Sequence, residues 1–513
     1  MLLKVKFLNL FAGRPVAIMH AKTAKKLAIY VNERAKIKKK GNNAIVAIVD
    51  IATGILHEDE IALSGEIIQE LKLKENEIVE ISAASRPKST DYISEKLNGK
   101  KLSYEKILSI MEDIVDNSLT EAEIAYFVSG VYINGMDVEE TVNLTKAMVK
   151  TGKMLGIKSS VDKHSIGGIP GNRTTPIIVS ICCSAGLIMP KTSSRAITSA
   201  AGTADVIECL ADVEFSIEDI KSIIKETNGC MVWGGALGLA PADDKIIQVE
   251  RLLSIDSDAQ LLASILAKKL AVNASHILID IPFGENAKVK RKEALELAGK
   301  FKKIAGKLKL NVETVLTDGS QPVGNGIGPA LEARDVISIL KRSETKSSEM
   351  QFQGHRKSRD FLVFPAPADL ENKSVMLAGK ILEMAKKAKK GKGIEMAREI
   401  MDTGEAYKKF RQIIEAQGGS LENIDKKLNL AKLSKDITAE KDGKITEINN
   451  KAIAAIARAA GCPSDKSAGI YLQVHNNFKV RKGQLLMKIY AETEEKLDFA
   501  VSASKQLIPI TIK

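Results

Sequence analysis

The side chains best suited to chemistry gather in one glycine-rich stretch, VDKHSIGGIPGNRTT, at residues 161–175. Glycine lets backbone N–H groups approach an anion closely, and lysine and hydroxyl side chains add charge and further donors. The stretch is not a Walker loop, because no Gly-Lys-Ser/Thr sequence ends it. Its composition leaves two interpretations open, an anion-binding loop or an ordinary turn with incidental charges. The residues concerned are Lys163, His164, Ser165, Gly167, Gly168, Gly171 and Arg173.

A second stretch of the same kind, PKTSSRAITSAAGTADVIE, follows at residues 190–208. Hydroxyl groups and an arginine at the start of a helix suit an oxyanion, since a helix N-terminus offers free N–H groups and positive potential. The same cluster could merely cap the helix. An apolar run at 177–182, expected to be a strand, separates the two stretches, and their closeness favours an anion site. The polar members are Lys191, Ser193, Ser194, Arg195, Thr198, Ser199 and Thr203.

Further candidates lie in and around a predicted helix at 259–270. Asp256 comes just before it, where a carboxylate ordinarily serves the helix N-terminus. Ser264 and Lys268 are four residues apart and share one helix face. Lys288 follows a predicted strand, and open α/β sheets bind ligands at such strand ends. Alone, none of these positions singles out a ligand.

Two regions precede the glycine-rich stretch. Residues 1–85 alternate polar turns with strand-like runs and predict a β-rich domain. Residues 86–160 carry helix signals, namely capping residues followed by apolar positions on one face. The capping signals are Ser103 and the pairs Ser118 with Glu121 and Asp137 with Glu140, and the strand-like runs are 44–51 and 77–82.

From residue 161 onward, short apolar runs alternate with helical segments and glycine-rich turns. This pattern predicts α/β units around a largely parallel sheet, a series that the helix at 259–270 interrupts. Residues 343–364 are expected to form a surface loop, and the chain beyond Thr438 a β-rich module. The runs expected as strands are 177–182, 229–233, 276–281 and 312–316.

The composition of the 513 residues limits the class of protein. Lys and Arg number 76 against 64 Asp and Glu, a net charge of +12, which favours a negatively charged partner. Aromatic residues make up only 4%, which argues against the base-stacking surfaces of single-strand nucleic-acid binders. The five cysteines form no CxxC pair, and no HExxH, GxSxG or EF-hand motif occurs, so we expect reduced thiols, no metal and no serine-hydrolase site. With no secretory leader or membrane-spanning stretch in the sequence, we expect a cytoplasmic protein.

The two polar stretches also carry a family resemblance. VDKHSIGGIPGN followed by KTSSRAITSAAGTADVIE resembles the signature of nucleoside phosphorylases of the thymidine phosphorylase family. With GGALGLAPADD, SIDSDAQLLASILAKKLA and TDGSQPVGNGIGPALEARDV, and with residues 1–85 as an additional domain, the chain is most similar to the long-chain branch that acts on AMP. The likeness runs from about Ser103 to Gly419 and more loosely to both ends.

The resemblance implies phosphorolysis, in which AMP and phosphate give adenine and ribose 1,5-bisphosphate. It implies an α/β multidomain fold, in which a small α-helical domain at 86–160, completed by about 241–271, faces a larger α/β domain at 161–430 across a cleft. An N-terminal β-rich domain at 1–85 would serve oligomerisation, and a C-terminal α+β domain would occupy 431–513. Phosphate is a co-substrate, and neither metal nor cofactor is implied. The expected partners are the nucleotide, phosphate and further copies of the chain in a homodimer or larger homo-oligomer, not nucleic acid or a membrane.

Residue by residue, the resemblance assigns roles to the candidates. Asp256 matches the proton donor to the departing base, and Lys163, Arg195 and Lys288 are expected to offset the repulsion between two phosphate groups. Positions that match nucleotide contacts are Gly168, Ser194, Arg195, Ala196, Ile197, Thr198, Ser199, Thr203, Ser264 and Lys288. Positions that match phosphate contacts are Lys163, Ser165, Ser193 and Thr203, with His164 and Lys268 as supporting residues.

The substrate assignment has alternatives. Pyrimidine enzymes of the family carry an Arg in the stretch after APADD, where this chain has Val249 or Glu250, and this departure counts against thymidine. Lys268, in contrast, matches a pyrimidine-contacting lysine, and TDGSQPVG is shared with bacterial long-chain proteins described as thymidine phosphorylases. Thymidine phosphorolysis is therefore the second hypothesis. A nucleic-acid-binding protein and a nucleotide-binding regulator without turnover are remote, since no RNA-binding signature occurs and both Asp256 and Lys163 are present.

Overall fold

The computed structural model describes residues 1–39, 44–157, 159–196, 199–253, 255, 257–341, 366–424 and 428–513. The chain forms two compact units, one made of Met1–Gly152 with Ala240–Ala267 and the other of Lys153–Leu239 with Lys268–Lys513. The surface loop expected at 343–364 lies outside the described residues. The division into four domains that the sequence suggests stays a prediction.

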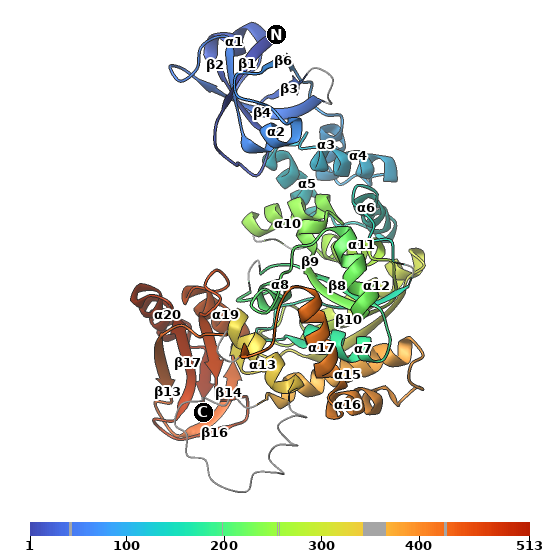
Figure 1. Cartoon of the computed structure of the whole chain (residues 1–513), viewed down its shortest axis with the longest axis vertical. Coiled ribbons are helices and arrows are strands. Elements are labelled where there is room, and N and C mark those ends of the chain that lie inside the picture. Colours follow the sequence, from blue (N-terminus) through green and yellow to red (C-terminus); the bar gives the residue numbers. More distant parts are fainter. Residues whose placement is uncertain are drawn as a thin grey trace. The chain divides into compact units, whose positions relative to one another are not determined.

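The first unit begins with a closed six-stranded barrel, in the strand order β1-β5-β2-β4-β3-β6 (Figure 1). Closure leaves no free sheet edge, and alternate side chains such as Val5, Ile37 and Ile61 fill the interior. The β-rich expectation for this region is confirmed, including the runs at 44–51 and 77–82. The elements are β1 (Leu2–Phe7), β2 (Val16–His20), α1 (Ala21–Leu27), β3 (Arg34–Lys38), β4 (Ala44–Ala52), β5 (Glu60–Leu63), α2 (Gly65–Leu71) and β6 (Ile78–Ala83).

The rest of the first unit is a bundle of helices around a buried apolar cluster that includes Ile110, Phe127 and Ala263. The chain reaches this cluster in two passes, because α10 and the first part of α11 return to it after the strands that follow α6. The helices are α3 (Ser89–Leu97), α4 (Tyr104–Val115), α5 (Glu121–Asn134), α6 (Val138–Lys150), α10 (Pro241–Leu253) and α11 (Asp258–Ala271).

The capping signals of the bundle are mostly where the sequence placed them. Ser103 caps α4, and Asp137 forms a capping box with Glu140 at α6. The box predicted at Ser118 with Glu121 is wrong, since the structure forms it two residues later, between Thr120 and Glu123. Two overlapping segments, SLTE and TEAE, satisfy the same spacing, and the spacing alone does not distinguish them.

The second unit holds the parallel sheet that the sequence predicts. Three strands lie in the order β11-β10-β7, and β8 pairs with β9, all in parallel. A hydrogen bond of 2.9 Å from Val161 N to Ile188 O joins the start of β7 to the chain entering β8. The strands are β7 (Ser160–Ser165), β8 (Met189–Ser193), β9 (Gly229–Trp233), β10 (Ala274–Phe283) and β11 (Asn311–Asp318).

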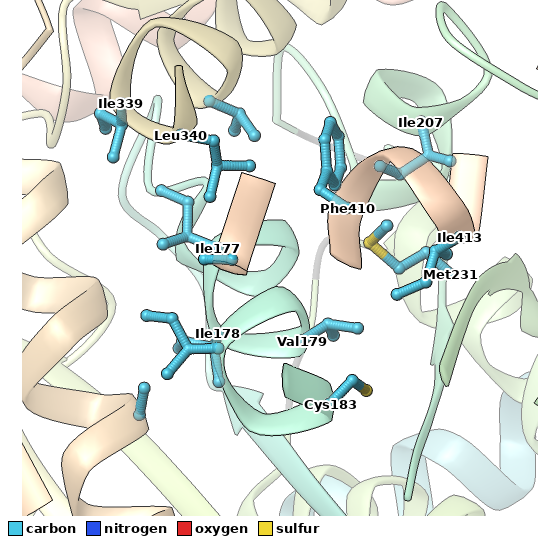
Figure 2. Packing of buried hydrophobic residues seen from close by; sticks show 14 of the residues in the cluster. Ile177, Ile178, Val179, Cys183, Ile207, Met231, Ile339, Leu340, Phe410 and Ile413 are labelled. Carbon is cyan, nitrogen blue, oxygen red and sulfur yellow. The ribbon is translucent and has the colours of Figure 1, made fainter. Parts of the chain in front are cut away.

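One predicted strand of this series is wrong. Residues 177–182 lie inside α7 (Thr174–Ser184), whose side chains from Thr174 to Cys183 are all buried. Figure 2 shows Ile177, Ile178 and Val179 of this helix among side chains from several other elements. A helix surrounded on every side has no polar face, so its sequence has the continuous apolar character of a buried strand.

This part of the second unit holds further helices, some of which pack on the strands and others on α7. They are α8 (Thr203–Ile207), α9 (Ile217–Thr227), the 3-10 helix η1 (Gly234–Leu237), α12 (Arg291–Lys307), α13 (Pro329–Leu340), α15 (Ala368–Met384), α16 (Gly393–Asp402) and α17 (Glu405–Ala416). Among the described residues, no helix is both long and apolar enough to cross a membrane.

The end of the chain forms the β-rich module expected beyond Thr438, with two helices on it. A short strand from the preceding region, β12, pairs with β15 and joins the sheet β12-β15-β17-β13, which ties the module to the rest of the second unit. The elements are β12 (Gly326–Ile327), β13 (Leu433–Thr438), β14 (Gly443–Ile448), α19 (Asn450–Ala459), β15 (Gly469–Leu472), β16 (Lys479–Val480), β17 (Leu485–Ala491), α20 (Glu494–Leu507) and β18 (Ile510–Ile512).

Candidate functional site

Strand β7 places the charged residues of the first stretch on both sides of the sheet. Because side chains alternate along a strand, Lys163 and Ser165 belong to one face and Asp162 and His164 to the other. Lys163 is only 2% exposed, and its Nζ donates a hydrogen bond of 2.9 Å to Thr174 Oγ1 at the start of α7. The first stretch is thus folded back on itself, with its lysine in the interior.

On the Lys163 face, two ammonium groups share one carboxylate. Asp280 of β10 is fully buried, and its Oδ2 lies 3.8 Å from Lys163 Nζ and 3.3 Å from Lys373 Nζ of α15. Its other oxygen accepts a hydrogen bond of 2.5 Å from Thr317 Oγ1. Burial raises the pKa of Asp280, but the two lysines outweigh this effect and keep the pKa below its usual value. Asp280 is therefore ionised.

On the other face, a second carboxylate has the same arrangement. Asp162 lies 3.2 Å from Lys191 Nζ of β8 and 2.7 Å from Lys269 Nζ of α11, and all three side chains are buried. Burial and the neighbouring lysines, Lys269 first, hold the pKa of His164 well below its ordinary value. His164 is accordingly a neutral imidazole at physiological pH.

These contacts leave a surplus of positive charge inside the second unit. Among the described residues, each of the two aspartates is shared by two lysines, so four lysine amino groups face two carboxylates. Burial lowers the pKa of one of them, Lys269, to about 7, and the surplus is clearest at Asp280, between Lys163 and Lys373. Buried ions are expensive unless they are paired, and a negative ligand at this place offsets the surplus. The arrangement favours the anion-binding interpretation of the first stretch over an incidental turn.

The glycines of the first stretch allow close contacts with two other loops. Gly168 has a φ of +86°, and a Cβ atom there would lie 3.1 Å from Lys288 N and 3.0 Å from Lys288 Cβ. Gly171 has a φ of +68°, and a Cβ atom there would lie 2.5 Å from Val323 O. Both positions therefore need glycine for the backbone angle and for the space. The structure thereby brings together Gly168 and Lys288, two of the predicted nucleotide contacts.

Arg173 connects the two polar stretches. Its guanidinium donates to Thr203 Oγ1 at 2.6 Å and to Ala201 O at 2.9 Å, both in the second stretch. It also donates at 2.8 Å to Glu332 of α13, which is buried. The arginine thus fixes the loop after β7 against the loop after β8. The hydroxyl group of Thr203, which accepts one hydrogen bond from Arg173, can still accept another and donate one to a ligand.

The arginine of the second stretch is already paired. Arg195 donates to both carboxylate oxygens of Glu208, at 2.6 and 2.7 Å, and to Glu214 at 2.9 Å, and its guanidinium lies 4.8 Å from the ring centre of Trp233. Hydrogen bonds from Arg195 lower the pKa of Glu208 to about 2. Its expected role against phosphate charge stays a prediction.

The remaining residues of the second stretch are held by backbone contacts. Asp205 accepts hydrogen bonds of 2.7 Å from Ala196 N and Gly202 N, which tie both residues to the start of α8. Ser193 Oγ donates to Val232 O at 3.4 Å and Ser199 Oγ to Ala201 O at 3.2 Å. Ser194 and Ser199 are exposed, so their hydroxyls are open to a ligand.

Other predicted site residues lie elsewhere. Ser264 belongs to the first unit, where its Oγ donates to Asp243 Oδ2 at 2.7 Å, and Lys268 begins the part of α11 that belongs to the second unit. Lys268 is one of the positive charges that lower the pKa of His164. The positions of Ile197, Thr198 and Asp256 lie outside the described residues.

Sequence reasoning missed several members of the charged cluster. Asp280 carries a signal in hindsight, since a lone carboxylate in the buried run HILIDIPF needs a cation nearby. Asp162 precedes Lys163 directly and has the same kind of signal. Lys269 and Lys373 have none, because a lysine in an amphipathic helix is ordinarily a surface residue.

Comparisons with known protein families match three parts of the chain. Residues 90–152 match the helical bundle domain of a glycosyl transferase family, and residues 158–407 match the a/b domain of the same family. Residues 444–511 match the pyrimidine nucleoside phosphorylase C-terminal domain. In fold, anthranilate phosphoribosyltransferase from Thermus thermophilus is similar, with a TM-score of 0.51 and 17% identity, over 64% of this chain and 100% of that one.

Full-length relatives are much nearer in sequence. An AMP phosphorylase of Methanocaldococcus jannaschii is 44% identical over 513 residues, covering 100% of this chain and 97% of the relative. Those of Pyrococcus furiosus and Thermococcus kodakarensis are 43% and 42% identical, each covering 99% of this chain and 97% of the relative. These values extend the likeness over the barrel, the bundle, the α/β region and the C-terminal module, and the chain belongs to the AMP phosphorylase family.

Proposed function

We propose that the protein catalyses the reversible phosphorolysis of AMP, in which AMP and phosphate give adenine and ribose 1,5-bisphosphate. The observation that carries the proposal is the surplus of buried positive charge around Lys163 and Asp280, beside the loop that packs on Lys288. Both the co-substrate and the 5′-phosphate of AMP are anions, and such a site stabilises them. The curated names of the full-length relatives support AMP as the nucleotide.

The chemistry of the reaction indicates what the residues must do. The bond between C1′ and the base breaks through a ribose with positive, oxocarbenium-like character, and a phosphate oxygen forms the new bond to C1′. The departing base needs a proton, for which we propose Asp256. The attacking phosphate is proposed to be positioned by Lys163, Ser165, Ser193 and Thr203. The 5′-phosphate is proposed to be bound by Lys288 and the loop that contains Gly168.

The proposal includes the finer expectations that the resemblance implies. We propose that closure of the active site over the bound substrates excludes water, which favours phosphate over hydrolysis. The enzyme needs no metal or cofactor, acts in the cytoplasm and assembles as a homodimer or larger homo-oligomer. The matched pyrimidine-type C-terminal domain keeps thymidine as the second substrate to test.

The experiment measures base release with and without inorganic phosphate, for AMP and thymidine in parallel. Phosphate-dependent adenine from AMP, with little thymine from thymidine, is the expected result. Release of thymine from thymidine, with no release of adenine from AMP, would contradict AMP as the substrate but would leave phosphorolysis as the reaction. Base release from AMP that does not depend on phosphate would identify a hydrolase and overturn the reaction itself.

A further inference from the structure

Lys373 reaches the phosphate stretch from a distant part of the sequence. It lies on α15, and its side chain is 9% exposed, with Nζ 3.3 Å from Asp280 Oδ2. Lys163 Nζ lies 3.8 Å from the same oxygen. The resemblance assigns no role to Lys373, and no motif of the sequence includes it.

The charge balance around Asp280 indicates that Lys373 has an electrostatic role in addition to its packing. One ammonium group is enough to neutralise one buried carboxylate, and Thr317 already satisfies the other oxygen of Asp280. A second buried ammonium adds a desolvation cost and leaves the trio with a net positive charge. Arg173 and Lys191 also act on Lys163, while Asp318 and Asp369 act on Lys373 at longer range. Lys163 is thus surrounded mainly by positive charge.

We propose that Lys373 is a positioning residue for inorganic phosphate: by sharing the charge of Asp280, it prevents this carboxylate from neutralising Lys163, whose ammonium then attracts the anion. The inference rests on the proposed function, because it gives the anion at Lys163 the role of co-substrate. Lys373 acts through Asp280 and Lys163 and is not assigned a contact with phosphate.

The titration of Lys163 provides an independent readout. Burial lowers the pKa of Lys163 to about 8, Asp280 opposes this shift, and Lys373 is the first of the positive neighbours that deepen it. Removing the Lys373 charge therefore raises the pKa of Lys163, since the charged form of Lys163 then meets less repulsion. A purely structural role of Lys373 predicts no such movement.

The test is Lys373→Gln, which replaces the charged amino group with a neutral amide of nearly the same length. Binding of inorganic phosphate is measured by calorimetry, and KM for phosphate and for AMP by kinetics, from about pH 6.5 to 10. We expect phosphate affinity to fall about tenfold at neutral pH, KM for AMP to stay within about twofold, and the alkaline loss of phosphate binding to move to higher pH.

Two controls separate charge from packing. Lys373→Arg keeps the charge, so both the phosphate affinity and the pH at which phosphate binding is lost should stay as in the wild type. Lys380→Gln removes a half-exposed lysine from the same helix, where it pairs with Glu383 at 3.9 Å, and should change neither. If Lys373→Gln does not fold, Lys373→Met replaces the buried ammonium with an apolar side chain of similar length and gives the same readouts.

The outcomes are distinct. Three results for Lys373→Gln would overturn the role of Lys373. The first is unchanged phosphate binding, and the second is a rise in KM for AMP as large as the loss of phosphate affinity. The third is that phosphate binding is lost at the same alkaline pH as in the wild type. The calorimetric arm uses phosphate alone, so it reports on Lys373 even if AMP is not the substrate. Failure of the proposed function is seen separately, as a wild-type protein that binds phosphate but does not release adenine from AMP.

Discussion

Lys163 carries its charge where burial and positive neighbours both oppose it, and this gives the site a definite pH dependence. Its pKa is lowered to about 8, so the ammonium is charged below about pH 8 and neutral above it. A bound anion favours the charged form, and binding therefore weakens as the pH rises through this value. We expect the Kd of inorganic phosphate to rise by up to about tenfold per pH unit between pH 8 and 10.

Calorimetric titration with phosphate over this range checks the prediction. The second ionisation of inorganic phosphate lies at about pH 7 and is mostly complete by about pH 8, so the charge of the ligand changes little above that pH. Lys163→Arg, whose guanidinium stays charged, should lose the alkaline limb even if its affinity differs. A wild-type Kd that stays flat up to about pH 10 would contradict the assignment of phosphate to Lys163.

Asp256 is the proposed acid, and its removal separates chemistry from binding. Asp256→Asn keeps the size of the side chain but cannot give a proton to the departing base. We expect turnover of AMP to fall by about 10²–10⁴-fold while AMP still binds. Single-turnover rates and calorimetric binding measure the two effects. Asp258→Asn at the exposed start of α11 is the matched control, and a loss of similar size there would point to the helix start instead.

Lys288 is proposed to bind the 5′-phosphate, which adenosine lacks. Lys288→Ala should weaken AMP binding by about 10- to 100-fold, the range for a hydrogen bond to a charged group, and leave adenosine within about twofold. The comparison of the two ligands by calorimetry checks this. Lys290→Ala removes an exposed lysine of the same loop, paired with Glu285 at 2.9 Å, and should leave both unchanged. An equal loss of affinity for AMP and adenosine would show instead that Lys288 contacts the base or the ribose, or that it stabilises the fold.

At the scale of elements, the loop after β7 must pass close to Lys288. Gly168→Ala adds a Cβ atom 3.0–3.1 Å from Lys288 and strains a φ of +86°, at a cost of about 1–2 kcal/mol. We expect a rise in KM for AMP together with the loss of stability. Gly167→Ala is a close control, because its φ of +84° imposes a similar strain while nothing lies within 4 Å of the added atom. Unfolding curves and KM values for both variants separate the close contact from the strain.

If Gly167→Ala raised KM for AMP as much as Gly168→Ala, strain in the loop would explain both, and the packing on Lys288 would lose its role. If neither variant changed KM, the loop would be able to shift without affecting AMP. The prediction thus depends on the difference between two neighbouring glycines.

The sequence predicts the elements well where each has a distinct pattern. The strands at 229–233, 276–281 and 312–316 lie between polar turns and are found as predicted. The run at 177–182 fails because a helix buried on all sides lacks the polar face that distinguishes a helix from a strand. The capping box at Thr120 was misplaced because two overlapping segments have the same spacing.

The candidate site is predictable only in part, for a related reason. Lys163, Gly168 and Thr203 lie in stretches whose composition marks them, and the resemblance names them. Lys373 comes from a helix with no local signal, and only the packing of α15 near β10 brings it to Asp280. Arg195 has the right type and place for an anion ligand, but its carboxylate partners, Glu208 and Glu214, come from later in the chain.

At the scale of the whole molecule, the C-terminal module supports the loops that follow β10 and β11. Asn286, in the loop that carries Lys288, donates to Glu447 Oε1 at 2.6 Å. Asn325 and His475 share a hydrogen bond of 2.9 Å, and Asn476 N donates to Gln321 Oε1 at 2.7 Å. A part of the chain with no predicted catalytic residue thus fixes the loops around the proposed nucleotide site.

Asn450 is the buried centre of this support, and its removal tests it. Its Nδ2 donates to Gly319 O at 2.8 Å and to Asn286 O at 3.4 Å, on the two loops. Asn450→Ala leaves these carbonyl groups without their donor, which should destabilise the protein by about 1–3 kcal/mol and loosen the loop that carries Lys288. We expect KM for AMP to rise several-fold while the affinity for inorganic phosphate, held at Lys163, stays near the wild-type value.

The neighbouring residue provides the matched control. Asn449 caps α19 by accepting a hydrogen bond of 3.0 Å from Ala452 N, so Asn449→Ala should lose about 1 kcal/mol of stability without touching either loop. If both variants raised KM for AMP alike, loss of stability would be the cause. A rise in Asn450→Ala alone would show that the module acts on the nucleotide through the Lys288 loop, because the two variants differ mainly in the contacts they remove.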